Sequence, residues 1–249
     1  MFSSWLAPFE TLPGVCQVCG AWPARPVCDA CADRFAGPQA RCRVCAAPVP
    51  DGLARCGACL TRTEPLAVQA CAAAVDYSYP WDRLIARFKF RGEPGWAAPF
   101  ARQMLRSAHT RELLAHADVV VPVPLTPARL GERGHNQAWE LVKAVQRLAR
   151  RHGLAQPAMA SADALVRLVD TADQHSLSRE QRLLNLRGVF APHPERVAHL
   201  RAAHVVLVDD VTTTGATLQT AARALRQAGA ARVDALVLAR TPGRHEPPL

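Results

Sequence analysis

The sequence has no apolar run long enough to cross a membrane, since a spanning helix needs about 20 consecutive apolar residues. The apolar start, residues 2–9, is too short for a signal peptide and has no positively charged residue in front of it. We therefore expect a cytoplasmic protein without membrane insertion. In a reducing compartment, paired cysteines are better explained as metal ligands than as disulfides.

Lysine is almost absent, because 28 of the 30 basic residues are arginine and only Lys89 and Lys143 are lysine. Arginine favours bidentate contacts to phosphate, although such a bias also arises from genomic composition. The formal net charge is +9, and eight zinc-bound thiolates with two Zn²⁺ would lower it to about +5. The charge alone is therefore weak support for nucleic-acid binding.

Cysteine is absent after residue 71, and eight of the nine cysteines form four Cys-x₂-Cys pairs. Each pair brings two sulfurs to one ion, and tetrahedral zinc needs two pairs. The pairs are Cys16/Cys19, Cys28/Cys31, Cys42/Cys45 and Cys56/Cys59. Combining neighbours in sequence closes the shortest loops and predicts two closed, structural zinc sites, with interleaved pairing as the alternative. We expect Cys71, in an apolar run, to be a buried, unreactive thiol.

The uneven cysteines predict two parts of the chain. Residues 1–66 would form an N-terminal double zinc-ribbon module, and residues 67–249 a larger domain. The module has few large aliphatic residues, so its folding should depend on the ions. Residues 1–15 are predicted to form a short amphipathic helix that packs against the rest.

Apolar runs alternate with helical patterns in the larger part. Runs at 67–75, 118–123 and 205–208 predict buried strands, with a further β-rich run at 232–239. Helical patterns lie at 81–92, 96–114, 138–152 and 218–227. This alternation predicts an α/β fold with an open, mainly parallel sheet flanked by helices, and a ligand site at the carboxyl ends of the strands. The strand order is left open.

The functional prediction rests on residues 205–217, where a buried strand is followed by two carboxylates, three threonines and a glycine before an alanine-rich helix. First-turn amides, the helix dipole and threonine hydroxyls favour a phosphate dianion, and Gly215 lets the backbone come close. Asp209 and Asp210 only accept hydrogen bonds when ionised, so they suit vicinal ribose hydroxyls. The predicted phosphate ligands are Thr212, Thr213, Thr214, Gly215, Ala216 and Thr217. A simple turn and helix cap is the alternative.

This string closely resembles the phosphoribosyl pyrophosphate (PRPP) motif of type I phosphoribosyltransferases, with the acidic pair and the Thr-Thr-Thr-Gly core unchanged. The resemblance implies that Mg²⁺ accompanies PRPP, mainly on substrate oxygens and water. It also implies that residues 125–137 hold the pyrophosphate, with Arg129 and Arg133 as cations and Asn136 and Gln137 as amide donors. Ordinary helix-surface arginines are the alternative for this segment.

Over most of its length the chain resembles the ComF/GntX family of competence-associated phosphoribosyltransferase-like proteins. The resemblance rests on Val-Pro-Val-Pro-Leu followed by Arg-Gly-His-Asn-Gln, on the four preceding cysteine pairs and on Arg-Phe-Lys-Phe-Arg-Gly. His135 stands where the family usually carries an aromatic residue, and we expect it to pack. Residues 153–203 match the family pattern at Arg167, Thr171, Gln174, Leu177, Arg182, Asn185 and Phe190. This segment would form a mobile lid over the site, with a solvated loop as the alternative.

The resemblance implies a PRPP- and Mg²⁺-dependent phosphoribosyltransferase linked to DNA uptake in natural transformation. Asp209 and Asp210 would stabilise the positive charge that grows on the ribose. The acceptor is not indicated, and a nucleobase is the default for the superfamily. The alternative is a non-catalytic PRPP sensor or adaptor that binds single-stranded DNA or a helicase-like competence ATPase. Residues 87–91 alternate basic and aromatic side chains, which an amphipathic helix edge explains better than a single-strand site.

Overall fold

The computed structural model describes residues 14–153, 158–168 and 188–242. Most of the predicted N-terminal helix lies outside the described residues, as do the predicted lid residues Thr171, Gln174, Arg182 and Asn185. The chain divides into two compact units between Gly37 and Pro38. The module boundary predicted at residue 66 stays a prediction.

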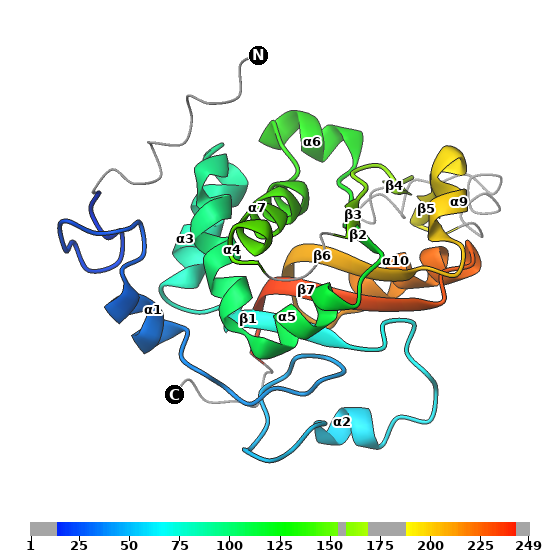
Figure 1. Cartoon of the computed structure of the whole chain (residues 1–249), viewed down its shortest axis with the longest axis horizontal. Helices are drawn as coiled ribbons and strands as arrows, with labels where there is room; N and C mark the ends of the chain where they lie inside the picture. The colour runs from blue at the N-terminus through cyan, green and yellow to red at the C-terminus, as the bar shows by residue number, and fades with distance from the viewer. Residues whose placement is uncertain (1–13, 154–157, 169–187, 243–249) are drawn as a thin grey trace, which may run out of the picture. The chain divides into compact units, whose positions relative to one another are not determined.

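The larger unit is built on a five-stranded sheet with the order β1-β7-β6-β2-β3, in which every neighbouring pair is parallel (Figure 1). The strands are β1 Cys71–Asp76, β2 Val119–Pro122, β3 Met159–Ala160, β6 His204–Thr212 and β7 Arg232–Arg240. The predicted α/β class with an open parallel sheet is confirmed. β6 lies at the centre of the sheet, between β7 and β2.

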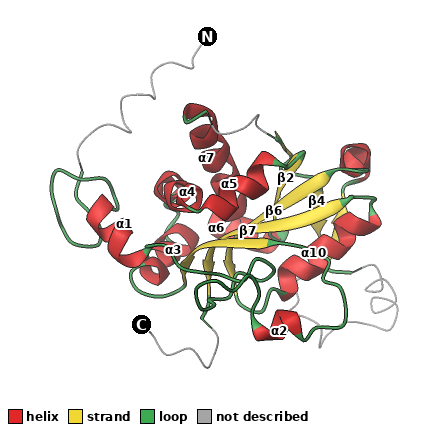
Figure 2. Ribbon diagram, turned by 60° about the horizontal axis from the view of Figure 1, so that its bottom comes forward, coloured by secondary structure: helices red, strands yellow, loops and turns green. Residues whose placement is uncertain are grey.

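Helices cover both faces of this sheet. The longer ones are α3 Trp81–Phe90, α4 Ala97–Arg106, α5 Ala108–Ala115, α7 Gln137–Arg151 and α10 Ala216–Gln227. α10 lies on the opposite face from α4 and α7 (Figure 2). Its buried side chains share one apolar cluster with Val205, Leu207 and Cys71, which places the odd-numbered side chains of β6 on the α10 face, because successive strand residues alternate between faces.

Shorter elements complete the unit. They are α2 Gly57–Leu60, α6 Pro127–Arg133, α9 Val197–Leu200, the 3₁₀ turns Pro94–Trp96 and Pro194–Arg196, and the antiparallel pair β4 Leu165–Arg167 and β5 Phe190–Pro192. The smaller unit contains α1 Asp29–Phe35. No helix among the described residues has the length and apolar character that a membrane span requires.

The prediction of one helix over residues 96–114 is wrong, because the chain breaks at Ser107. This residue is extended, with ψ of 126°, and its hydroxyl accepts a hydrogen bond from the Thr110 amide. A serine that caps a new helix competes with continuation of the old one, since its side chain satisfies a first-turn donor. The two resulting helices, α4 and α5, pack against β1 and β7.

The amino-terminal ends of β6 and β7 are tied together by the fully buried carboxylate of Asp234. Its Oδ1 accepts from the Ala70 amide at 3.0 Å, and its Oδ2 contacts His204 Nε2 at 2.8 Å and Arg232 Nε at 2.9 Å. A buried carboxylate is tolerated only when its oxygens are paired in this way. The cluster lies at the end of the strands opposite to residues 209–217, so it stabilises the fold without touching that segment.

We predict that Asp234→Ala strongly destabilises the protein, because it leaves two basic side chains and a buried amide without their acceptor. Loss of one partner of a buried pair costs about 3 kcal/mol or more. Urea denaturation of the zinc-loaded protein measures this loss. Asp163→Ala is the matched control, since Asp163 pairs with Arg196 on the surface and should cost no more than about 1 kcal/mol. Equal losses in the two variants would contradict the role given to Asp234.

Candidate functional site

The phosphate-binding prediction falls on a loop that joins β6 to α10. Gly215 is the residue before α10 and has φ of +80°, a left-handed conformation that disfavours side chains. Gly215 offers no side-chain cap, and Thr214 Oγ1 accepts from the Ala216 amide at 3.3 Å. First-turn amides of a helix have no partner within the helix. The start of α10 therefore presents donors to an anion.

The threonines of this loop differ in exposure. Thr213, Thr214 and Thr217 are exposed, whereas Thr212 is buried at the end of β6. The end of β7 fixes the loop, because Arg240 Nη1 donates to the Thr213 carbonyl at 2.9 Å and the Thr241 amide donates to the Thr212 carbonyl at 2.9 Å. The exposed hydroxyls are thus carried by a backbone that the sheet itself holds in place.

The two carboxylates leave β6 on opposite faces of the sheet. Strand alternation puts Asp209 on the α10 face and Asp210 on the α7 face. Asp209 Oδ1 accepts from the Asp210 amide at 2.8 Å. Asp210 is buried, and its Oδ1 lies 2.8 Å from Lys89 Nζ at the end of α3. The acidic pair therefore has a cationic partner from a helix far away in the sequence.

Burial and the negative charge of Asp210 raise the pKa of Asp209 to about 7. The positive charges of Lys89 and Arg167 oppose this rise in the pKa of Asp209, and the value of about 7 includes their effect. Arg167 belongs to the predicted lid segment; it ends β4, and its guanidinium lies 5.4 Å from the centre of the Phe190 ring. Asp209 is consequently poised between its protonated and ionised forms near neutral pH.

The predicted pyrophosphate segment forms α6 and the start of α7. Arg133 donates to Gln137 Oε1 at 3.1 Å, and its guanidinium lies 5.3 Å from the Phe90 ring centre. Phe90 directly follows Lys89, so the structure brings Arg133 close to the end of the helix that reaches Asp210. Arg129 lies in α6 and is partly exposed.

The two amides predicted to bind pyrophosphate have partners inside the protein. Asn136 Oδ1 caps α7 by accepting from the Ala138 amide at 2.9 Å, and its Nδ2 donates to the Val123 carbonyl at 3.2 Å. Gln137 is 1% exposed. Their role toward pyrophosphate stays a prediction. The expected packing of His135 is confirmed, since its ring lies 5.7 Å from that of Phe88.

Lys89 is not among the site residues predicted from the sequence, although the sequence carries a signal for it. It is one of two lysines in a chain whose other 28 basic residues are arginine. It also lies within the alternating basic and aromatic residues 87–91, which were interpreted as a helix edge. That interpretation accounts for buried Phe88 and exposed Phe90, but it leaves the ion pair of Lys89 unexplained.

The eight paired cysteines form two groups, Cys16/Cys19/Cys28/Cys31 and Cys42/Cys45/Cys56/Cys59, and within each group all sulfurs lie within 4.8 Å of one another. Individual S–S distances are 3.9 Å, 3.8 Å and 3.6 Å. A zinc tetrahedron with Zn–S bonds of about 2.3 Å has edges of about 3.8 Å. Both groups therefore fit structural zinc, and the predicted pairing of neighbours in sequence is confirmed.

One cysteine in each group has backbone donors that favour its thiolate, whereas burial raises the pKa of Cys31 and Cys59. Although burial raises the pKa of Cys16, amides of Cys28, Cys19 and Val18 lower it to about 6. In the second group burial likewise raises the pKa of Cys42, and backbone amides, first that of Cys56, lower it to about 7. Thiolate is the form that binds zinc. All four sulfurs of each site come from the protein, which leaves no open coordination position for catalysis.

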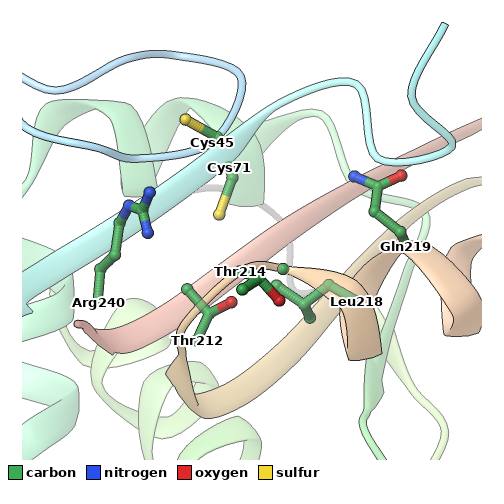
Figure 3. A pocket seen from close by; sticks show the side chains of 8 residues that line it. Cys45, Cys71, Thr212, Thr214, Leu218, Gln219 and Arg240 are labelled. Carbon is green, nitrogen blue, oxygen red and sulfur yellow. The ribbon is translucent and has the colours of Figure 1, made fainter. Parts of the chain in front are cut away.

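The second cysteine group adjoins the loop between β6 and α10, which is named the phosphate loop after its predicted role. Both lie within the larger unit. A cavity of about 30 Å³ is lined by Cys45, Cys71, Thr212, Thr214, Gly215, Leu218, Gln219 and Arg240. In Figure 3 the Cys71 side chain points from β1 toward Thr212 and Thr214. Such a volume holds about one or two water molecules and no sugar phosphate. The cavity therefore adjoins the loop without being a site for a sugar phosphate.

Two further contacts join this cysteine group to α10 and the sheet. Gln219 Oε1 accepts from the amides of Ala67 at 2.9 Å and Val68 at 3.2 Å. The Arg43 carbonyl accepts from the Cys71 amide at 2.8 Å. Cys71 is buried, as predicted, and burial raises its pKa to about 12. The low reactivity of this thiol stays a prediction.

A parallel sheet whose central strand ends in an acidic pair and a Thr-rich loop, followed by a helix start, defines a phosphoribosyltransferase-like domain. The family described as Phosphoribosyl transferase domain matches residues 161–249. DNA utilization protein YhgH of Escherichia coli K12 is 31% identical over 240 residues, covering 93% of this chain and 99% of that protein. Competence protein F of Haemophilus influenzae is 31% identical over 188 residues, covering 74% of this chain and 78% of that protein. The chain belongs to the ComF family.

Competence protein ComFC of Bacillus subtilis is 31% identical over 158 residues, covering 63% of this chain and 58% of that protein. Among solved structures, a hypoxanthine-guanine phosphoribosyltransferase from Schistosoma mansoni in complex with IMP gives a TM-score of 0.31 at 12% identity, covering 61% of this chain and 65% of that chain. The assignment to the family does not depend on this structural similarity.

We predict that Asp209→Asn stabilises the ligand-free protein, and more so at high pH. The pKa of an unfolded aspartate is about 3.9, and that of folded Asp209 is raised to about 7. The stability that the protonated carboxyl contributes is therefore lost as the pH rises through this window. Asparagine stays neutral. The Tm advantage of the variant should grow by at least about 2 °C between about pH 5 and pH 8, since each kcal/mol shifts the Tm of such a domain by about 2–4 °C.

Thr217→Ser, which alters no ionisable group, is the matched control for this titration. Its Tm difference from wild type should be the same at both pH values. A constant difference for Asp209→Asn as well would show that the pKa of Asp209 is not raised.

We predict that the two cysteine groups differ in what they stabilise. Cys45→Ser and Cys19→Ser should each reduce zinc content by about one ion per chain. Only Cys45→Ser should speed amide hydrogen exchange in α10, because Cys45 lies behind the loop that starts this helix. Zinc analysis and hydrogen exchange measure the two effects. Equal exchange rates in α10 of both variants would contradict the support assigned to the second group.

Proposed function

We propose that this ComF-family protein is a phosphoribosyltransferase that uses PRPP with Mg²⁺. The observation that carries the proposal is the continuity of β6, the acidic pair, the Thr-rich loop and the start of α10. Acceptors suited to ribose hydroxyls and donors suited to a phosphate follow one another on a backbone held by β7. The match of residues 161–249 to the family described as Phosphoribosyl transferase domain supports PRPP as the ligand.

The exposed threonines and first-turn amides of α10 would bind the 5′-phosphate, with help from the helix dipole. Asp209 and Asp210 would accept from the ribose hydroxyls and stabilise positive charge on the ring as the pyrophosphate leaves. Arg129 and Arg133 would hold the pyrophosphate. Mg²⁺, when bound, would neutralise oxygens of the leaving group. No nucleophilic side chain is needed, since positioning and electrostatics lower the barrier.

The protonation of Asp209 bears directly on this function. A protonated carboxyl loses acceptor capacity toward the hydroxyls, and it cannot stabilise a developing cation. Because the pKa of Asp209 is raised to about 7, affinity for PRPP should fall as the pH drops below neutrality. A cationic neighbour lowers this pKa, so bound Mg²⁺ near the site favours the ionised form.

We further propose a role in DNA uptake, supported by the names DNA utilization protein YhgH and Competence protein F of its relatives. Single-stranded DNA is the proposed nucleic-acid partner, and a helicase-like competence ATPase is the proposed protein partner. Phe90 is 70% exposed beside the Arg133 guanidinium, an arrangement on which a base can stack. Cysteines grouped for metal binding support a cytoplasmic location.

We predict that PRPP with Mg²⁺ raises the Tm of the protein, because the ligand binds only the folded state. At a ligand concentration of about 100 times Kd the gain is about 2.7 kcal/mol, or roughly 5–10 °C for a domain of this size. An Asp209→Asn, Asp210→Asn double variant should lose the shift, and Asp163→Asn, on the surface, should keep it. Equal shifts in wild type and double variant would contradict the assigned site.

Pyrophosphate release decides whether binding leads to turnover. Bases, nucleotides and single-stranded DNA are screened as acceptors with PRPP and Mg²⁺. Release with one of them, lost in the double variant, supports the transferase. A protein that shows the Tm shift but releases no pyrophosphate with any acceptor would instead be a PRPP sensor.

A further inference from the structure

The cationic partner of the acidic pair comes from α3, outside the PRPP motif and outside residues 125–137. Lys89 Nζ lies 2.8 Å from Asp210 Oδ1, and the two side chains are 17% and 9% exposed. An ion pair this far from water loses much of the hydration of both charges. Such a pair is weak evidence for stability, because its desolvation cost offsets its Coulomb energy. Its position at the carboxylates calls for a functional explanation.

The fold holds Lys89 firmly at this place. α3 buries Trp81, Leu84, Ile85 and Phe88, and the Phe88 ring packs against Phe100 at 5.5 Å and His135 at 5.7 Å. The residue before Lys89 is thus fixed between α4 and the segment that leads into α7. The residue after it, Phe90, carries the Arg133 guanidinium on its ring. Lys89 therefore reaches Asp210 from a rigid helix end.

Charges from three elements meet at the acidic pair. Asp209 and Asp210 are adjacent on β6, Lys89 comes from α3, and Arg167 comes from β4. Two neighbouring carboxylates repel each other, and a cation beside them reduces that repulsion. Lys89 binds one oxygen of Asp210, and an ionised carboxylate has a second oxygen with which to accept a hydroxyl.

We propose that Lys89 is a positioning residue of the PRPP site, whose ammonium orients the Asp210 carboxylate toward the ribose hydroxyls and lets both aspartates be ionised together. This inference rests on the proposed function. Lys89 orients the site through Asp210, and its charge also lowers the pKa of Asp209. At a pH where Asp209 is already ionised, the contribution of Lys89 should therefore vanish when Asp210 can no longer be charged. A charge at this point is needed, whereas the length of the side chain is secondary.

The test compares PRPP–Mg²⁺ affinity by calorimetry between about pH 6 and pH 8.5 in Lys89→Met, Lys89→Arg and wild type. Lys89→Met should weaken PRPP binding at least about tenfold at neutral pH, which corresponds to raising the pKa of Asp209 by about one. The variant should also move the midpoint of the pH profile of binding to a higher pH. Lys89→Arg, which keeps the positive charge, should keep most of the wild-type PRPP affinity and a midpoint of the pH profile close to that of wild type. Lys143→Met replaces the other lysine, which pairs with Glu140 on α7, and should behave as wild type.

A double variant separates positioning from general damage to the fold. In the Asp210→Asn background at about pH 8.5, where Asp209 is ionised with or without Lys89, Lys89→Met should change PRPP affinity less than about twofold, since the carboxylate that it orients is absent. An equally large loss in that background overturns the inference. So does a Lys89→Met protein with wild-type affinity and pH profile. If wild type itself binds no PRPP, the proposed function fails first, an outcome distinct from failure of Lys89 alone.

Discussion

One constraint governs the structure: β6 is buried on both faces, so its side chains can meet a ligand only at one end of the strand. β6 is enclosed by β7 and β2 along its sides and by helices above and below. Its apolar residues 205–208 are all buried. Only toward the carboxyl end of the strand can charged and hydroxyl side chains approach a ligand. The acidic pair and the threonines follow there, and the crossover to α10 turns the backbone amides in the same direction.

The same constraint explains the electrostatics of the pair. Alternation along a strand sends Asp209 and Asp210 to opposite faces of the sheet, so each meets a different environment. Asp210 meets the ammonium of Lys89, while Asp209 lies nearer the side of α10 and β4, where burial raises its pKa to about 7. Two chemically identical side chains thus meet different surroundings. A raised carboxyl pKa such as that of Asp209 is common where proteins bind or transform charged ligands.

The two zinc sites have the same chemistry and different structural consequences. The first group belongs to the smaller unit, where the amides of Cys28 and Cys31 donate to the sulfurs of Cys16 and Cys28 at 3.4 Å. The second group lies in the larger unit, where Ala46 is fully buried in the α10-side core. Gln219, one turn into α10, accepts two amides of the chain that leaves this group. The second site is therefore part of the support of the phosphate loop.

The sequence alone determined the local features of this protein, because their physical causes are local. Spacing within four cysteine pairs sets two tetrahedral sites, and a run of apolar residues followed by acids, threonines and Gly215 sets a strand, a loop and a helix start. The tertiary structure alone decided the strand order, the engagement of Asn136 and Gln137 inside the protein, and the ion pair of Lys89 with Asp210. Contacts between distant elements depend on how helices and strands pack and rotate against one another, which residue spacing along the chain does not encode.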